Sequence, residues 1–391
     1  MNLDAIIEIC GPGAASAAPE QRRVYSRDAS RIQGQCRAVA WPTEAGHIAG
    51  LVAWASREDI DLVPRGAGTG LCGGATPQDS LVVDFSRMNR ILEIDPSSRR
   101  ARVGPGVVLE TLNRTLAGAG LWLPVVPGSH RAAAVGGMIA TDAAGLAAVC
   151  YGSMRQWVER VTLIDGLGRT HDLAGERLAD VVGREGASGF VVEATLRLTE
   201  PPGPREVRLE ALRDERQAVT RREEWLADPG LTALEYLNPY AAAAIGWPAR
   251  PHLLVERQVQ MPPADQAQAA ALWKARDGLY PVLARAGHPV IEDPRLDAAG
   301  LAELLPWLAN QDIPVFGHLG AGIIHPCFRD PTDPRIAELY ARVAAAGGSV
   351  SGEHGIGLKK RRWASPAWRE TVQQLKRNYD PQQIINRGKT C

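Results

Sequence analysis

The sequence predicts an α+β fold divided into two domains, and three observations support this prediction. Short apolar strands, turns and occasional helices alternate through the first half, whereas longer helical stretches mix with strands in the second. Between them lies Pro201-Pro202-Gly203-Pro204, a run that interrupts regular structure. The 391 residues are enough for two domains with a sizeable core in each. We therefore expect one domain over residues 1–203 and a second over 204–391.

In the first half, the expected elements follow one another closely. The spacing of Ile48, Leu51 and Val52 predicts a helix over residues 44–56. The remaining elements are a strand over 80–85, a hairpin pairing 90–94 with 99–103, a helix over 108–119, a hairpin pairing 161–164 with 169–173, and a strand over 190–198.

In the second half, helices outnumber strands. The expected elements are helices over 214–227, 264–286, 298–309, 333–346 and 367–378, and a strand over 253–260. Pro334 stands in the opening turn of its helix, where proline is tolerated. No internal repeat is visible, so a solenoid is excluded.

Composition excludes several classes of function. Lysine plus arginine equals aspartate plus glutamate at 44 each, so the chain has no overall basic charge that would favour nucleic acid. No apolar run approaches the ~20 residues of an integral membrane segment. The first ten residues lack the basic and apolar regions of a secretory signal. The six cysteines are scattered and form no C-x-x-C pair, so no iron–sulfur motif is present. Free thiols are the default in a reducing cytoplasm, and we expect a cytoplasmic protein.

Two glycine-rich segments near the C-terminal end concentrate groups that bind metals and protons. They span residues 317–326 and 351–357. His318, His325 and Glu353 supply two imidazoles and a carboxylate, which suit a divalent metal such as zinc or manganese. His354 remains available to handle a proton.

A structural role for these histidines is the alternative. His318 and His325 are seven residues apart, so they would point to opposite faces of an unbroken strand. They can share a metal only if the chain bends between them. Gly320 and Gly322 supply the conformational freedom for that bend.

Three loops of small residues in the first domain suggest a long ligand. Residues 65–74 contain five glycines, and similar loops lie between 127 and 153 and at 186–189. The first loop is neither a P-loop nor a Rossmann fingerprint, because Gly-Lys-Ser/Thr does not follow and the glycine spacing differs. Each loop alone could be a tight turn. Together they favour a pyrophosphate lying against backbone N–H groups.

The order of these segments resembles the vanillyl-alcohol-oxidase-like flavoproteins, which carry a PCMH-type FAD-binding domain. The resemblance is to the D-lactate dehydrogenase and glycolate oxidase large-subunit branch and covers nearly the whole chain. The segments that carry it are 64–71, 136–152, 186–198 and 380–389, the last similar to a terminal Asn-Pro-Gly-Lys signature with Arg387 in place of proline.

This resemblance implies a non-covalently bound FAD, held by the first domain and covered by a cap in the second, an FAD-linked oxidase C-terminal domain. Residues from about 380 to 391 are expected to return to the flavin domain. The expected FAD-binding residues are Pro64, Arg65, Gly66, Ala67, Gly68, Thr69, Gly70 and Leu71 in the first loop, Pro127, Gly128, Ser129, Gly136, Gly137, Ala140 and Thr141 in the second, and Gly186, Gly189, Val192 and Asn386 further along.

The resemblance also implies oxidation of a D-2-hydroxy acid, such as lactate, glycolate or 2-hydroxyglutarate, to the 2-oxo acid. His318, His325 and Glu353 would then bind the metal, and His354 would be the base. Arg276 would bind the substrate carboxylate, because an unpaired buried anion is costly, and Lys359 and Lys360 are second candidates for this role.

One departure from the family pattern leaves other activities open. Between the two histidines relatives usually read Gly-Asp-Gly-Asn, whereas this chain has Gly-Ala321-Gly-Ile323. Ile323 cannot form the hydrogen bond that asparagine offers, so oxidation of a different alcohol or lactone is one alternative. A catalytically weak FAD-binding subunit is another. Since the chain has no iron–sulfur motif, we expect an iron–sulfur or electron-transfer partner, through which it would associate with the membrane periphery.

Overall fold

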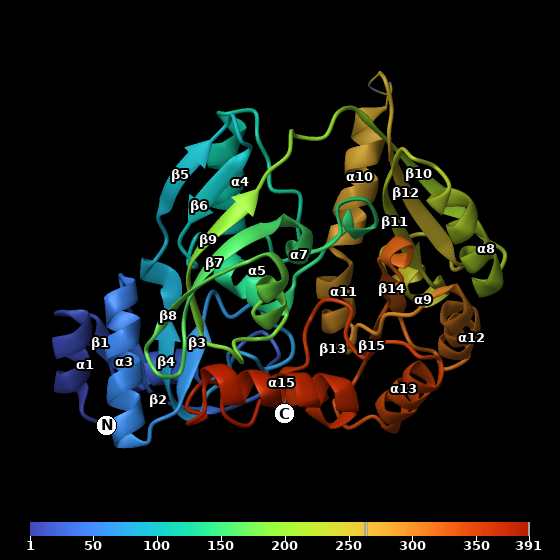
Figure 1. The fold of residues 1–391 in the computed structure, drawn as a ribbon. Helices are drawn as coiled ribbons and strands as arrows, with labels where there is room; N and C mark the ends of the chain where they lie inside the picture. The colour runs from blue at the N-terminus through green and yellow to red at the C-terminus, as the bar shows by residue number, and fades with distance from the viewer. Residues whose placement is uncertain (262, 264, 390–391) are drawn as a thin grey trace. The chain divides into compact units, whose positions relative to one another are not determined.

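The computed structural model describes residues 1–261, 263 and 265–389, and its chain divides into two compact units (Figure 1). Unit 1 joins Met1–Ala143, Ser153–Pro201 and the C-terminal segment from His354 onward. Unit 2 joins Ala144–Gly152 and Pro202–Glu353. Along the chain, the units change between residues 201 and 202 and between 353 and 354. The domain boundary at 203 and the return to the flavin domain from about 380 stay predictions.

The first sheet of unit 1 has four strands in the order β1-β2-β4-β3. They are β1 (Ala15–Ser16), β2 (Gln35–Ala40), β3 (Leu62–Arg65) and β4 (Gln78–Asp84). Strands β2 and β3 run parallel to β4, and β1 is antiparallel to β2. The accompanying helices are α1 (Leu3–Cys10), α2 (Pro19–Tyr25) and α3 (Ala45–Glu58). Apolar residues of α1 and α3 share a core with β3 and β4, which confirms the predicted helix over 44–56 and strand over 80–85.

The second sheet of unit 1 has five antiparallel strands in the order β5-β6-β9-β7-β8. They are β5 (Ile91–Asp95), β6 (Arg100–Val103), β7 (Val158–Ile164), β8 (Thr170–Ala174) and β9 (Phe190–Arg197). Both predicted hairpins are present, with Ile94 opposite Ala101 and Val161 opposite Leu173.

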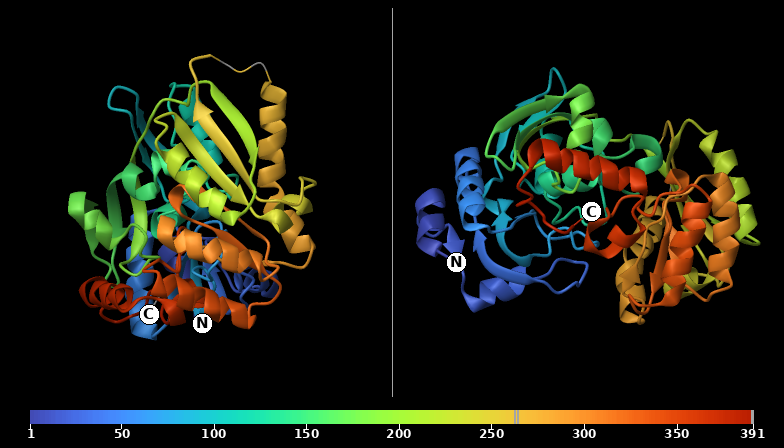
Figure 2. Two further views of the ribbon diagram at one scale, coloured as in Figure 1. Left: turned by 90° about the vertical axis from the view of Figure 1, so that its right-hand side faces the viewer. Right: turned by 60° about the horizontal axis from the view of Figure 1, so that its bottom comes forward.

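Helices and short turns complete unit 1. They are α4 (Leu109–Ala117), α5 (Val135–Thr141), α7 (Met154–Trp157), α14 (Gly357–Lys360), α15 (Pro366–Tyr379), η1 (Phe85–Arg87), η2 (Gly175–Asp180) and η4 (Arg361–Trp363). Leucines of α4 and residues of α5 share one core with the five-stranded sheet, and Leu375 and Tyr379 of α15 join it. Figure 2 shows α15, in red, in both of its views.

After α15 the chain runs alongside β3. The N–H of Leu62 donates to the carbonyl of Ile384 at 2.7 Å, and the N–H of Asn386 donates to the carbonyl of Leu62 at 2.9 Å. This pairing joins the C-terminal segment to the four-stranded sheet. Thr390 and Cys391, the end of the predicted returning segment, lie outside the described residues.

Unit 2 contains a six-stranded antiparallel sheet in the order β10-β12-β11-β14-β15-β13. The strands are β10 (Arg205–Ala211), β11 (Leu231–Leu237), β12 (His252–Gln258), β13 (Val290–Ile291), β14 (Val315–Gly317) and β15 (His325–Phe328). The helices are α6 (Ala148–Tyr151), α8 (Glu215–Leu226), α9 (Pro239–Ala244), α10 (Gln266–Asp277), α11 (Leu279–Arg285), α12 (Ala298–Ala309) and α13 (Pro334–Ala345).

Helices α8 and α10 lie on opposite faces of this sheet (Figure 1). Neighbouring residues of a strand point to opposite faces. Glu235 of β11 contacts Arg276 of α10, and Tyr236 interacts with Glu215 of α8. All seven residues of β11 are consequently buried.

One predicted helix is interrupted. The sequence suggested a single helix over 264–286, but the structure has α10 and α11, which meet at Gly278. Pro281 lacks the N–H that a continuous helix would bond to the carbonyl of Asp277. Ala264, the predicted start, lies outside the described residues. In the described part of the chain, no helix combines the length and apolar character needed to cross a bilayer.

Candidate metal centre and flavin-binding loops

The hairpin β14–β15 brings two distant histidines together. His318 follows β14 and His325 begins β15, and Phe316 pairs with His325 across the hairpin. Between them the chain makes a 3₁₀ turn, η3 (Leu319–Ala321), and then a left-handed residue, Gly322, at φ 75°. The two imidazole rings lie 5.2 Å apart between centroids, nearly perpendicular to each other. The predicted bend is therefore present.

Gly322 has a steric as well as a conformational reason to be glycine. A Cβ atom there would lie 2.3 Å from the carbonyl oxygen of Leu296. Gly320 has no left-handed conformation, but a Cβ on it would meet Val149 at 2.8 Å. Both positions exclude side chains because neighbouring segments approach the turn closely.

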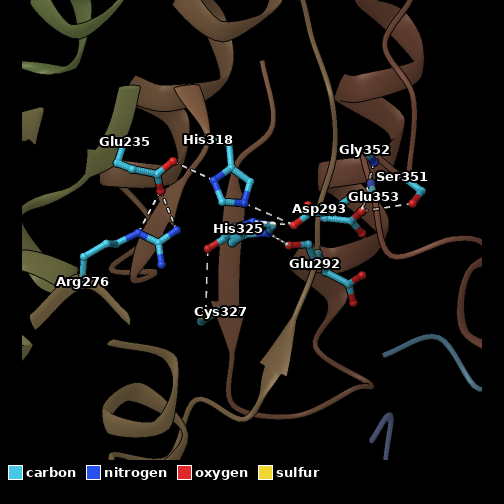
Figure 3. A network of polar contacts seen from close by, with 10 residues as sticks. All are labelled: Glu235, Arg276, Glu292, Asp293, His318, His325, Cys327, Ser351, Gly352 and Glu353. Atoms are coloured by element: carbon cyan, nitrogen blue, oxygen red, sulfur yellow. Dashed lines mark hydrogen bonds and ion pairs between the residues drawn. The ribbon is translucent and has the colours of Figure 1, made fainter. Parts of the chain in front are cut away.

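Glu353 completes a set of three converging groups (Figure 3). Its Oε1 lies 3.4 Å from Nε2 of His318 and 3.3 Å from Nε2 of His325. The three potential ligand atoms all lie within 4.8 Å of one another. Since both imidazoles direct the same nitrogen toward one carboxylate oxygen, the set can converge on a single ion.

The far nitrogens of both rings have partners of their own. Nδ1 of His318 donates to Oε1 of Glu235 at 2.7 Å, and Nδ1 of His325 donates to the backbone carbonyl of Glu292 at 3.2 Å. Such bonds fix which nitrogen faces a metal. Both histidines therefore direct Nε2 toward Glu353, the orientation that a metal ion bound between them would require.

Asp293 holds the segment that carries Glu353. One of its oxygens, Oδ2, accepts the hydroxyl of Ser351 at 3.0 Å and the backbone N–H groups of Gly352 and Glu353 at 2.9 and 2.8 Å. Asp293 is completely buried, so these bonds are shielded from water. Each of the three converging groups thus has an outer support.

The electrostatics of the cluster favour a positive charge at its centre. Although burial alone would lower it, the carboxylates of Glu235 and Glu353 raise the pKa of His318 to about 10. Burial opposes ionisation of Glu353, but His318 and His325 hold its pKa well below the usual range. Two buried carboxylates, Glu235 and Glu353, flank His318, and Glu353 approaches His325 as well. A divalent cation at the centre would take the place of the proton that these carboxylates favour on His318.

The residues present fit a divalent metal. Two imidazole nitrogens and one carboxylate form a donor set typical of catalytic zinc, and manganese accepts the same ligand types. Three protein ligands leave coordination positions for a substrate. His318, His325 and Glu353 would hold the ion.

Arg276 lies in the same network, on α10. Its Nε and Nη2 donate to Oε2 of Glu235 at 2.8 and 2.5 Å, and its guanidinium stacks over Phe316 at 4.8 Å. The side chain is buried, and its contacts to Glu235 use two of its three nitrogens. Its expected role toward a substrate carboxylate stays a prediction.

In unit 1, Glu185 organises the loop that begins with His354. Its two carboxylate oxygens accept the N–H groups of Ile356 at 2.6 Å and Gly357 at 2.8 Å. Gly355 has φ 83°, and a Cβ there would lie 2.9 Å from the Glu185 carboxyl group. Burial raises the pKa of Glu185 to about 7, against the opposing effect of these N–H groups.

The predicted flavin-binding segments converge within unit 1. A Cβ atom added to Gly186 would lie 3.2 Å from both Pro64 and Asn386, so these three segments approach closely. A Cβ atom added to Gly66 would lie 3.0 Å from Ala134. The N–H of Glu185 donates to the carbonyl of Ala140 at 2.7 Å, which joins the second and third loops.

The C-terminal segment is tied to the same loops. Nδ2 of Asn386 donates to the carbonyl of Glu185, and Nζ of Lys389 donates to the carbonyl of Gly74, each at 2.8 Å. Burial lowers the pKa of Lys389 to about 7.

The first loop also has free hydrogen-bond donors. Within the described residues, the backbone N–H groups of Ala67, Gly68, Thr69 and Gly70 donate to no protein acceptor. Unused backbone donors in a glycine-rich turn suit the pyrophosphate of a dinucleotide. These residues therefore fit FAD.

Two residues of the network, Glu235 and Asp293, are not predicted from the sequence. Glu235 stands alone in an otherwise uncharged strand, and a carboxylate in a buried strand requires a partner. This lone charge in an apolar strand is the feature of the sequence that could have identified Glu235. Asp293 lies in a short polar run with no distinguishing pattern, so only its contacts identify it.

Two family models match the chain. One, described as an FAD binding domain, matches residues 36–174, which include the first two glycine loops. The other, described as the C-terminal domain of FAD linked oxidases, matches residues 254–390 and includes the converging histidines and Glu353.

Curated relatives align over nearly the whole chain. D-2-hydroxyglutarate dehydrogenase of Xanthomonas citri pv. viticola is 30% identical, with 95% of this chain and 93% of the relative covered. Glycolate oxidase subunit GlcD of Bacillus subtilis is 28% identical, with 99% and 96% covered. D-lactate dehydrogenase of Archaeoglobus fulgidus is 28% identical, with 90% of each covered.

Solved structures share the fold. An alkyldihydroxyacetonephosphate synthase aligns with a TM-score of 0.73 over 99% of this chain and 85% of its own, at 16% identity. At that identity the likeness concerns the fold alone.

Proposed function

The chain belongs to the family of FAD-linked oxidases, and on this basis we propose that it is an FAD-dependent dehydrogenase of a D-2-hydroxy acid. The reaction would convert the acid to its 2-oxo acid, with the proton and the hydride leaving separately. The relatives named for D-2-hydroxyglutarate, glycolate and D-lactate support this substrate class. The observation that carries the proposal is the convergence of His318, His325 and Glu353.

The proposed chemistry divides the work between the chain and its bound groups. His318, His325 and Glu353 would hold a divalent cation, whose charge would orient the carboxylate and hydroxyl of the substrate and favour loss of the hydroxyl proton. An imidazole nitrogen of His354 accepts that proton. FAD, when bound, supplies the hydride acceptor for the C2 hydrogen.

We propose that the loops of unit 1 hold FAD without a covalent bond. The backbone donors of residues 67–70 would face the pyrophosphate, and Pro64, Gly186 and Asn386 would lie beside the dinucleotide. The electrons would leave to a partner protein, in keeping with a relative that is named as a subunit.

Anaerobic titration tests this proposal. The purified protein should have a flavin absorption spectrum that D-lactate, glycolate or D-2-hydroxyglutarate bleaches, and a chelator should slow that bleaching. Replacing His354 by alanine should slow bleaching by ~10²–10⁴-fold. His47→Ala, which removes a histidine near the surface of α3, is the control and should leave the rate unchanged. Bleaching that no chelator affects would exclude the metal-assisted mechanism.

Ile323 favours a second candidate, a flavin oxidoreductase of a different alcohol or lactone. Its side chain is buried and lies against Gly352, where a Cβ would come within 2.6 Å of it. An apolar group against Gly352, the neighbour of Glu353 in the sequence, offers no hydrogen bond to a polar substrate. This candidate predicts bleaching by an alcohol without a 2-carboxylate, independent of metal. Absence of bleaching by any alcohol would instead indicate a catalytically weak FAD-binding subunit.

A further inference from the structure

A buried chain of three polar side chains leads from α10 to the converging histidines. Arg276 on α10 contacts Glu235 on β11, and Glu235 contacts His318 after β14 (Figure 3). Glu235 is wholly buried, and the other two are 7% exposed. Burial removes these three polar groups from water, which costs free energy. Their presence in the interior of one unit therefore indicates a specific role.

Glu235 divides its two oxygens between its neighbours. Oε1 accepts the Nδ1–H of His318, and Oε2 accepts both N–H groups from Arg276. A guanidinium is planar and presents its donors in a fixed geometry, so it fixes the carboxylate more firmly than a flexible ammonium would. Phe316 beneath the guanidinium restricts it further. Oε1 is therefore held at one place and one angle to His318.

We propose that Glu235, held by Arg276, is the residue that positions His318 as a metal ligand. It selects Nε2 as the free nitrogen, sets the plane of the ring, and strengthens the imidazole as a donor. This inference rests on the metal site of the proposed function but concerns residues outside the ligand set. Arg276 then acts through Glu235, which differs from its predicted contact with substrate.

A second buried glutamate in the same sheet provides a matched control. Glu256 on β12 accepts hydrogen bonds from Arg205 at 2.7 Å and from Thr232 and Trp273 at 2.9 Å. Like Glu235 it is buried and paired with an arginine. Its bonds lead to none of the converging groups. Loss of Glu256 should therefore weaken the fold without affecting metal affinity.

Zinc affinity of the full-length, FAD-loaded protein is the measurement, obtained by competition with a chromogenic chelator. Glu235→Gln should lower affinity for Zn²⁺ by ~10–100-fold, the usual effect of losing an outer partner of a metal ligand. Glu256→Gln should change it by less than about threefold. Thermal unfolding of both variants, followed in parallel, separates loss of affinity from loss of fold.

Glu235→Asp covers the case in which glutamine at this site prevents folding. It keeps a carboxylate to pair with Arg276 but is shorter by one methylene, so it withdraws the oxygen from His318. It should fold and should still lose zinc affinity. Wild-type affinity in a folded Glu235 variant, or an equal loss in Glu256→Gln, would overturn the inference.

Arg276→Met tests the route through Glu235. It should lower zinc affinity, and the double variant with Glu235→Gln should lose no more than the more affected single variant, because both changes act on one contact. A raised KM for substrate with unchanged zinc affinity would instead place Arg276 on the substrate and refute this part.

The inference and the proposed function fail differently. A wild-type protein that binds zinc but whose flavin no hydroxy acid reduces would refute the function, and the affinity series would still decide the role of Glu235. A wild-type protein without zinc affinity would refute both.

Discussion

Replacing Gly322 by alanine tests whether the turn between the two histidines is as closely packed as the structure indicates. The residue has φ 75°, a conformation that costs an L-residue ~1–2 kcal/mol. In addition, the new Cβ would lie 2.3 Å from the carbonyl oxygen of Leu296, and relieving such overpacking costs ~1–3 kcal/mol. The total is ~2–5 kcal/mol.

Gly246→Ala separates the two contributions. Gly246 is also in unit 2 and has φ 81°, but nothing lies within 4 Å of its Cβ position. This control should lose only the conformational cost of ~1–2 kcal/mol. The two variants should therefore differ by the overpacking cost of ~1–3 kcal/mol. At about 2–4 °C for each kcal/mol, the melting temperature of Gly322→Ala should be lower than that of Gly246→Ala by ~2–12 °C.

Zinc affinity gives a second readout of the same change. Because Leu296 is joined to the turn by its N–H bond to the Gly322 carbonyl, relief of the clash has to move the segment between His318 and His325. Gly322→Ala should therefore weaken zinc binding, and Gly246→Ala should not. Equal melting temperatures and equal affinities in the two variants would refute the close approach.

Three further predictions concern the supports of the site. Asp293→Asn should reduce zinc affinity by ~10–100-fold in a chelator competition, because it weakens the three hydrogen bonds that hold the segment of Glu353; unchanged affinity would contradict this. Above pH 7, where Glu185 with its pKa of about 7 is ionised, Glu185→Gln should increase amide hydrogen exchange at residues 356–357, since their N–H groups lose a charged acceptor; unaltered protection would contradict the role of Glu185 in holding this loop. Lys389 should make stability depend on pH: its folded pKa of about 7 lies below the value of 10.5 for an exposed lysine, so the unfolded chain binds the proton more readily between these values. The stability of the wild type relative to Lys389→Met should then rise with pH across that window, by at most ~1.4 kcal/mol per pH unit, as read from urea unfolding; a flat difference would exclude a buried neutral lysine.

Arg205→Met and Asp79→Asn serve as controls for these predictions. Arg205 supports Glu256 and contacts none of the converging groups, so its loss should leave zinc affinity unchanged. Asp79 is exposed and paired with Arg37 at the surface, so its replacement should change stability by ~0–1 kcal/mol at neutral pH.

Elements with strong local signals can be predicted without the structure. The apolar spacing of Ile48, Leu51 and Val52 is enough to predict α3, and Pro334 marks the first turn of α13. The two hairpins of unit 1 follow from short apolar runs separated by turn residues. The candidate ligands could also be named, because residue type and glycine-rich surroundings are visible in the sequence.

The arrangement of those candidate ligands depends on long-range packing. His318 and His325 meet because Gly322 reverses the chain against Leu296, a contact between segments far apart in the sequence. Strand β11 gave no periodic signal, since both of its faces are buried and its residues form an almost continuous apolar run. Glu235 was hidden within that run.

The supporting residues depend on spatial neighbours that no local pattern encodes. Glu235 is explained by Arg276 and His318, which lie 41 and 83 residues away, and Glu185 by N–H groups more than 170 residues away. A buried carboxylate is stable only where donors from other segments surround it, and the fold alone brings those donors together. The sequence thus defined the chemical groups of the site, and the packing of strands and loops determined their orientation.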